Sequence, residues 1–291
     1  MKSIDAASLT FKRGRNVRLA DFDPGSTCGW DTKDDGRTKL RDDIERLAAL
    51  QEVLYAQTRH ALLVIFQGMD AAGKDGAIKH VMSGVNPQGV DVTSFKTPSA
   101  EELAHDYLWR CTRVLPERGR IGIFNRSYYE EVVVVRVHAP LLEGERLPAS
   151  SNPANIWKER FEDIVAFERH LARNGTLVLK FFLNISKDEQ RKRLLKRIDT
   201  PDKHWKLSPS DVRERSFWDS YQHAYEEMLS HTSSEAAPWY VIPANRKWVA
   251  RAAVASVIVN RLQSLDLAYP PISDEHRAQI LAERERLTEP S

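Results

Sequence analysis

The sequence predicts an α/β fold: a doubly wound parallel sheet of about five strands with helices on both faces. Short apolar runs with the length and β-branched content of buried strands recur along the chain. Segments of helical length separate these runs, which is the alternation expected when helices connect parallel strands. The expected strands cover residues 61–67, 90–95, 121–125, 176–183 and 239–243.

The helices are predicted from apolar periodicity and capping signals. The first should run from Arg37 to about Thr58, because apolar residues recur there at helical spacing. Ser99 and Glu102 have the spacing of a capping box, which predicts the start of another helix. Including that one, the later helices are expected near residues 74–84, 99–111, 126–137, 153–173, 187–198, 209–231 and 246–264.

The two ends of the chain differ from its centre. Residues 1–36 mix charge, Gly, Pro and Asp without periodicity, which indicates an irregular N-terminal arm. Residues 271–291 are highly charged and predict a C-terminal helix from about Asp274. The intervening residues 37–270 are expected to form the main domain.

Composition excludes several classes of protein. The 291 residues include 43 basic and 41 acidic ones, and a net charge of +2 argues against a general nucleic-acid binder. Two cysteines are too few for a disulfide framework, and the nine histidines show no zinc-ligand spacing. No signal peptide is recognisable, and no apolar run approaches the ~20 residues that span a bilayer. We expect a cytoplasmic protein with no membrane segment.

The strongest local motif is GMDAAGK at residues 68–74, which fits G-x-x-x-x-G-K between a predicted strand and a predicted helix. Such a P-loop wraps backbone N–H groups around phosphate oxygens at a helix N-terminus, and its lysine adds a positive charge. The alternative is an ordinary glycine-containing turn. The predicted phosphate-binding residues of this region are Gly68, Ala71, Ala72, Gly73, Lys74, Asp75 and Lys79.

One departure from the motif concerns the metal ion. Asp75 follows Lys74, where P-loop enzymes usually have a Ser or Thr that holds Mg²⁺. Asp70, inside the loop, is the natural substitute, because a carboxylate beside an anion site makes sense if a hard cation lies between them. We therefore expect Asp70 to bind Mg²⁺, with Mn²⁺ as an alternative ion. Its other interpretation is a side chain that stabilises the turn.

A second motif, NRSYYEE, begins at the end of the predicted strand 121–125. Arg126 is expected to clamp phosphate and stabilise charge during transfer. Asn125 stands where ordinary P-loop enzymes carry a Walker-B aspartate. Asn125 and Glu130 are candidates for contacts with the nucleotide acceptor, although a solvated helix face is an equally open interpretation of Glu130.

A basic stretch covers residues 187–215, with ten Lys or Arg against six Asp or Glu. A solvated helix is the simpler interpretation of such a run. Beside a P-loop, however, it is typical of a lid that closes over phosphates and excludes water. The candidate phosphate-binding residues of this lid are Arg193, Arg197, Lys203 and Lys206.

Taken together, these segments resemble the polyphosphate kinase 2 family from about Phe22 to Tyr269. The resemblance is carried by FQGMDAAGKDGAIKHVMSGVNPQGVDVTSF, DYLWR, GIFNRSYYEEVVVVRVH, LKFFLNISKDEQRKR and APWYVIPANRKW. It implies a P-loop kinase fold, related to thymidylate kinase, with a helical lid. It also implies reversible, Mg²⁺-dependent transfer of phosphate between polyphosphate and nucleotides. Asp70, Lys74 and Arg126 occupy the catalytic motif positions.

The form of the NRS motif is similar to the single-domain subgroup that uses both AMP and ADP. The implied partners are polyphosphate and nucleoside mono- and diphosphates, in a homo-oligomer such as a dimer or tetramer. Because no adenine-specific signature is evident, we expect guanine nucleotides to be accepted as well. The alternatives are an ATP-dependent nucleotide kinase of the same fold and a non-catalytic nucleotide- or RNA-binding module.

Overall fold

The computed structural model describes residues 6–11, 14, 16–148, 154–206 and 209–288. Its sheet has five parallel strands in the order β2-β3-β1-β4-β5. These strands are β1 (Ala61–Gln67), β2 (Val90–Ser94), β3 (Ile121–Asn125), β4 (Thr176–Asn184) and β5 (Trp239–Pro243). The predicted sheet is confirmed, with strand ends displaced by no more than one residue.

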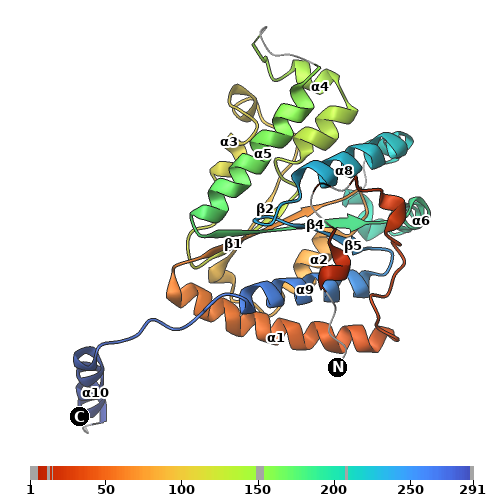
Figure 1. Ribbon diagram of the computed structural model, residues 1–291. Coiled ribbons are helices and arrows are strands. Elements are labelled where there is room, and N and C mark those ends of the chain that lie inside the picture. The colour runs from red at the N-terminus through yellow and green to blue at the C-terminus, as the bar shows by residue number, and fades with distance from the viewer. Residues whose placement is uncertain (1–5, 12–13, 15, 149–153, 207–208, 289–291) are drawn as a thin grey trace.

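Helices cover both faces of the sheet (Figure 1). One face carries α1 (Lys33–Gln57), α2 (Lys74–Val81) and α9 (Lys247–Gln263). The other carries α5 (Ile156–Arg173) and α8 (Trp218–Thr232). All seven residues of β1 are buried, as expected for the central strand of a sheet covered on both faces.

Helix α1 begins at Lys33, four residues earlier than predicted. Thr32 and Asp35 form a capping box, in which each side chain accepts a hydrogen bond from the other residue's backbone N–H. The preceding arm contains two 3-10 turns, Ala6–Leu9 and Leu19–Asp21. Its residues Leu9, Val17, Leu19 and Trp30 are buried, so the arm packs on the body of the protein.

The helix predicted at 99–111 is wrong in extent. Ser99 and Glu102 do form the predicted capping hydrogen bonds, but only a 3-10 turn, Glu102–Ala104, follows them. The backbone becomes extended at His105, and the Asp106 carboxylate accepts a hydrogen bond from the Leu108 N–H. That local bond competes with helix formation. The short helix α3 (Trp109–Thr112) follows.

The helix predicted at 126–137 begins later than expected. Arg126 has a φ of 65°, which a right-handed helix cannot include, so the chain first makes a turn. Residues Glu131–Val135 then form a π-helix, a rare form that is often found near functional sites. The short helix α4 (Pro140–Glu143) follows.

The helix predicted at 187–198 is confirmed as α6 (Lys187–Ile198), and a 3-10 segment, Pro201–Lys206, comes next. The helix predicted at 209–231 is divided into α7 (Pro209–Glu214), a 3-10 turn (Arg215–Phe217) and α8. Helix α10 (Asp274–Thr288) agrees with the predicted C-terminal helix, and Figure 1 shows it set apart from the body. Within the described residues, no helix combines the length and apolarity needed to cross a membrane.

Candidate functional site

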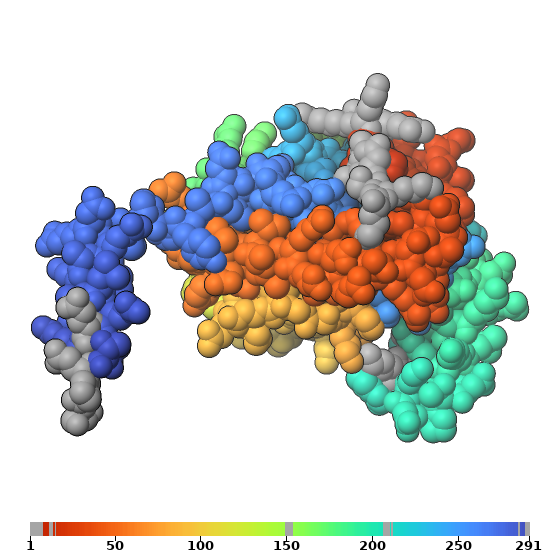
Figure 2. Space-filling model, turned by 90° about the horizontal axis from the view of Figure 1, so that it is seen from below, coloured from red at the N-terminus to blue at the C-terminus, as the bar shows by residue number. Residues whose placement is uncertain are grey.

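A cavity of about 840 Å³ lies where the parallel strands end. Parallel strands deliver their C-terminal residues to one edge of the sheet, and ligands bind there in many α/β proteins. The cavity is lined by the loop after β1, by β2 and the residues that follow it, by the end of β3, by helices α2 and α9, and by the predicted lid. Figure 2 shows a hollow between helix α1, in orange, and the teal segment that contains α6.

The loop that follows β1 requires glycine at two positions. Gly68 has a φ of 145° and Gly73 a φ of 111°, both in the region that side chains rarely adopt. A Cβ atom on Gly68 would also lie 2.8 Å from the carbonyl oxygen of Leu183. The two glycines therefore let the loop turn sharply between β1 and α2 while it passes close to β4.

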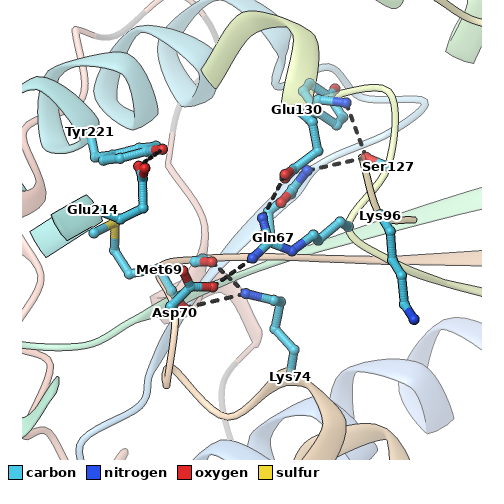
Figure 3. Close-up of polar contacts among 12 residues, drawn as sticks. Gln67, Met69, Asp70, Lys74, Lys96, Ser127, Glu130, Glu214 and Tyr221 are labelled. Carbon is cyan, nitrogen blue, oxygen red and sulfur yellow. Dashed lines mark hydrogen bonds and ion pairs between the residues drawn. The ribbon is translucent and has the colours of Figure 1, made fainter. Parts of the chain in front are cut away.

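Lys74 is buried at the first turn of α2. Its Nζ donates hydrogen bonds to the carbonyl oxygens of Gly68, at 2.6 Å, and Met69, at 3.3 Å (Figure 3). Burial and the nearby charge of Arg126 lower the pKa of Lys74 to about 8. The loop thus holds its lysine folded back over its own backbone, at the wall of the cavity.

Arg126 connects the end of β3 to the loop. Its Nη2 donates to Asp70 Oδ1 at 2.5 Å and its Nη1 to Glu130 Oε2 at 2.7 Å. Its backbone N–H donates to the Phe66 carbonyl, which fixes the residue in its left-handed conformation. These two carboxylates raise the pKa of Arg126 above its ordinary value, with Glu130 the larger influence. The three predicted catalytic residues thus lie together.

The predicted acceptor residues lie at the same edge of the sheet. The Asn125 side chain donates to Asp75 Oδ1 at 2.9 Å, so it joins the end of β3 to the start of α2. The Glu130 carboxylate accepts a hydrogen bond from Arg126 and is not among the described residues that line the cavity. Asn125 does line the cavity.

A buried polar cluster supports the turn after Arg126. The carboxylate of Glu168 accepts hydrogen bonds from the hydroxyls of Tyr128 and Tyr129, both at 2.8 Å. Lys180, on β4, donates to Glu168 at 2.6 Å, to the Tyr129 hydroxyl and to the carbonyl of Thr232. Lys180 and Glu168 are fully buried. The cluster therefore ties the segment that carries Arg126 to the centre of the sheet.

Arg193 has a different environment from the one predicted for a phosphate ligand. All three of its guanidinium nitrogens donate to protein acceptors at 2.5–3.0 Å. The acceptors are the Glu189 carboxylate and the carbonyl oxygens of Ala71, Ala72, Ala244 and Asn245. Arg193 thus connects the glycine-rich loop, helix α6 and the segment after β5, and these contacts occupy its donors.

We expect Arg193→Lys to lower kcat by about tenfold or more, because one ammonium group cannot replace a planar fork that binds several carbonyls. The loop would lose two of its anchors, and small displacements of positioning groups are costly. Steady-state kinetics and thermal melting of this variant and of Arg197→Lys would test this. Wild-type kcat in Arg193→Lys would contradict the positioning role.

The described lining of the cavity is strongly positive, with ten basic and two acidic residues, although the whole chain is nearly neutral. The predicted Lys79, Arg197 and Lys203 belong to it, whereas the side chain of Lys206 lies outside the described part. The sequence analysis missed four further basic residues of this lining: Lys96, Lys196, Lys247 and Arg251.

A signal for two of these missed residues was present. Lys247 and Arg251 are one helical turn apart at the start of α9, directly after a strand end. Strand ends of this kind carry ligand-binding residues in parallel sheets. Burial lowers the pKa of Lys247, and the surrounding positive charges, Arg193 first among them, lower it further. The cavity wall therefore holds more positive charge than its own carboxylates balance.

The residues present fit a magnesium ion that is bound jointly by protein and substrate. The described part of the chain contains no group of three His, Cys, Asp or Glu residues that could hold a metal ion. Mg²⁺ usually binds one or two carboxylates together with water and substrate phosphates. Asp70 lines the cavity, with its side chain 26% exposed, and could supply such a carboxylate.

Comparison with known proteins identifies the family. The model of the family described as "Polyphosphate kinase 2" matches residues 31–269. The chain belongs to the polyphosphate kinase 2 family. The matched residues include every strand of the sheet and all of the site described above.

Two relatives of known name are similar to this chain over most of their length. An ADP-polyphosphate phosphotransferase of Rhodopseudomonas palustris is 54% identical, over 94% of this chain and 95% of its own. An AMP/ADP-polyphosphate phosphotransferase of Meiothermus ruber is 47% identical, over 87% and 91%. The crystal structure of polyphosphate kinase 2 from Arthrobacter aurescens superposes with a TM-score of 0.87, at 40% identity, over 97% of this chain and 99% of the other.

Proposed function

We propose that this protein transfers phosphate reversibly between inorganic polyphosphate and nucleotides, converting AMP to ADP and ADP to ATP, with guanine nucleotides also accepted. The observation that carries the proposal is the positively charged cavity at the glycine-rich loop, in a member of the polyphosphate kinase 2 family. A nucleotide alone would not require ten basic residues, whereas a long polyanion would. The names of both curated relatives agree with this substrate class.

In the proposed mechanism, the Gly68–Lys74 loop acts as a P-loop. Its backbone N–H groups and Lys74 hold the phosphoryl group, and Arg126 stabilises the charge that develops during transfer. Asp70 and Glu130 orient Arg126 by accepting hydrogen bonds from its two Nη atoms. Residues 187–215 close over the donor and exclude water. Catalysis then consists mainly of positioning and electrostatic stabilisation, as is usual for phosphoryl transfer.

Mg²⁺, or Mn²⁺ in its place, would neutralise charge between donor and acceptor when bound. We propose that the Asp70 carboxylate holds it, together with phosphate oxygens of the substrates. We also propose that Asn125 contacts the acceptor nucleotide, and that the protein acts in the cytoplasm as a dimer or tetramer.

The decisive experiment supplies the purified protein with Mg²⁺ and long-chain polyphosphate, without ATP, and with either AMP or ADP. We expect chromatography to show ADP formed from AMP and ATP formed from ADP. Formation of ATP from ADP alone would restrict the acceptor to diphosphates. No transfer from polyphosphate, with activity restored by ATP, would replace the proposal by an ATP-dependent nucleotide kinase.

The pKa of Lys74 predicts how polyphosphate binding depends on pH. The lysine is charged below its pKa of about 8 and neutral above it. Affinity of the free protein for polyphosphate should therefore decline as the pH rises through about 8. Fluorescence anisotropy with labelled polyphosphate, measured from pH 6.5 to pH 9.5 (roughly 1.5 units to either side of that value), would show this decline. Lys74→Arg, which stays charged, should flatten the profile, and the same decline in that variant would exclude Lys74 as its origin.

A further inference from the structure

A second groove, of about 390 Å³, lies beside the main cavity between helices α1 and α9. Lys247 and Arg251 of α9 line both spaces, so the groove continues the positively charged wall of the cavity. Its opposite side is formed by Lys33 and Arg37 of α1. The groove therefore leads away from the glycine-rich loop toward the beginning of the chain's first helix.

Close packing of the two helices brings these cations together. Gly36 of α1 is buried against the ring of Trp248, and a Cβ atom at this position would lie only 2.2 Å from that ring. Lys33 and Arg37 are one helical turn apart on α1, and both are exposed. Lys247 and Arg251 have the same spacing on α9. Two pairs of cations thus line one groove.

Nearby carboxylates do not neutralise this charge. Glu189 lines the groove, but its carboxylate already accepts a hydrogen bond from Arg193 at 2.8 Å. Asp34 lies 3.4 Å from Arg37 in a pair whose side chains are both more than 60% exposed, and such pairs contribute little. The surplus of positive charge therefore faces solvent along an open path, which suits an extended polyanion.

We infer that this groove is a distal subsite for the polyphosphate chain, in which phosphates remote from the reacting end lie between Lys33 and Arg37 on one side and Lys247 and Arg251 on the other. The inference rests on the proposed function, because polyphosphate is its ligand. The inference also gives the direction in which the polyphosphate runs. Its unreacted part leaves the cavity over the N-terminal turns of α9 and α1. Donors too short to reach α1 would not use the subsite.

The test compares Lys33→Gln/Arg37→Gln with Arg41→Gln/Arg46→Gln. The second pair removes the same charge from exposed positions of the same helix that do not line the groove. Binding of long-chain polyphosphate and of tripolyphosphate is measured without nucleotide at several salt concentrations. Transfer to ADP is measured in parallel with long-chain polyphosphate.

We expect Lys33→Gln/Arg37→Gln to weaken long-chain binding several-fold and to leave tripolyphosphate binding and kcat unchanged. The slope of log affinity against log salt should become shallower by about 1.4, since each phosphate contact with a single-stranded polyanion contributes ~0.7. The control pair should match the wild type. Unchanged long-chain affinity and slope would overturn the subsite, and so would an equal loss for both ligands.

A failure of the distal subsite can be distinguished from a failure of the proposed activity. If wild-type protein transfers no phosphate from polyphosphate to any nucleotide, the proposed activity fails. The binding measurement without nucleotide still decides whether long polyanions occupy the groove. If transfer occurs and the two double variants bind long chains equally, only the distal subsite fails.

Discussion

Asp70→Asn is expected to lower kcat by about 10²–10³-fold with the fold intact, the range found when one group that stabilises transition-state charge is lost. Asp70 lines the cavity and accepts a hydrogen bond from Arg126 at 2.5 Å. Asparagine keeps the shape and an acceptor oxygen but removes the negative charge that a hard cation requires. Initial rates across a Mg²⁺ titration would measure both kcat and the Mg²⁺ concentration at half-activation.

Glu130→Gln provides the matched control, because Glu130 is the second carboxylate bound to Arg126 and lies outside the cavity lining. If Asp70 holds the metal ion, Asp70→Asn should shift half-activation to higher Mg²⁺, whereas Glu130→Gln should leave it at the wild-type value. If Asp70 only orients Arg126, the two variants should behave alike. Near-wild-type turnover of Asp70→Asn would remove the metal assignment.

The sheet and the glycine-rich loop were predictable from the sequence because both depend on local patterns. Strands β1, β3, β4 and β5 are mostly apolar runs, which indicates burial on both faces without knowledge of their neighbours. The loop depends on two glycines with positive φ and on a lysine at a fixed spacing, and the motif encodes all three. Parallel topology then placed Arg126, at the end of β3, beside this loop.

Tertiary contacts determine which basic side chains line the cavity, and the sequence alone does not show these contacts. A basic helix does not reveal which of its arginines faces inward, so the sequence offered no means of separating Arg193 from Arg197. Arg193 lies against the carbonyls of the loop and of the segment after β5. Arg197 lines the cavity and has no comparable set of bonds to the described residues. The contribution of α9 also depends on packing, because Lys247 is distant in sequence from the loop it faces.

The buried cluster around Lys180 shows how a site can depend on residues that do not line it. Lys180 lies in the middle of β4, fully buried, where the apolar pattern of the strand gave no sign of a polar role. Its ammonium group compensates the charge of Glu168, and Glu168 fixes both tyrosines that follow Arg126 and Ser127. Disturbing this pair should therefore affect stability first and the position of Arg126 second.

Lys180→Met is expected to lower the free energy of unfolding by about 3–5 kcal/mol, the usual cost of leaving one member of a buried ion pair without its partner. The lone Glu168 carboxylate would remain inside the core with only the tyrosine hydroxyls and no positive charge. Urea unfolding of this variant and of the wild type would measure the loss.

Lys180→Met/Glu168→Gln separates the charge effect from the loss of packing. The double variant has no charge left in this buried cluster, so it should be more stable than Lys180→Met alone. The double variant should also be more active than Lys180→Met, since Tyr128 and Tyr129 can still donate hydrogen bonds to a glutamine oxygen. The single variant Glu168→Gln completes the comparison. If the losses of stability in Lys180→Met and Glu168→Gln add up to the loss in the double variant, Lys180 and Glu168 act independently.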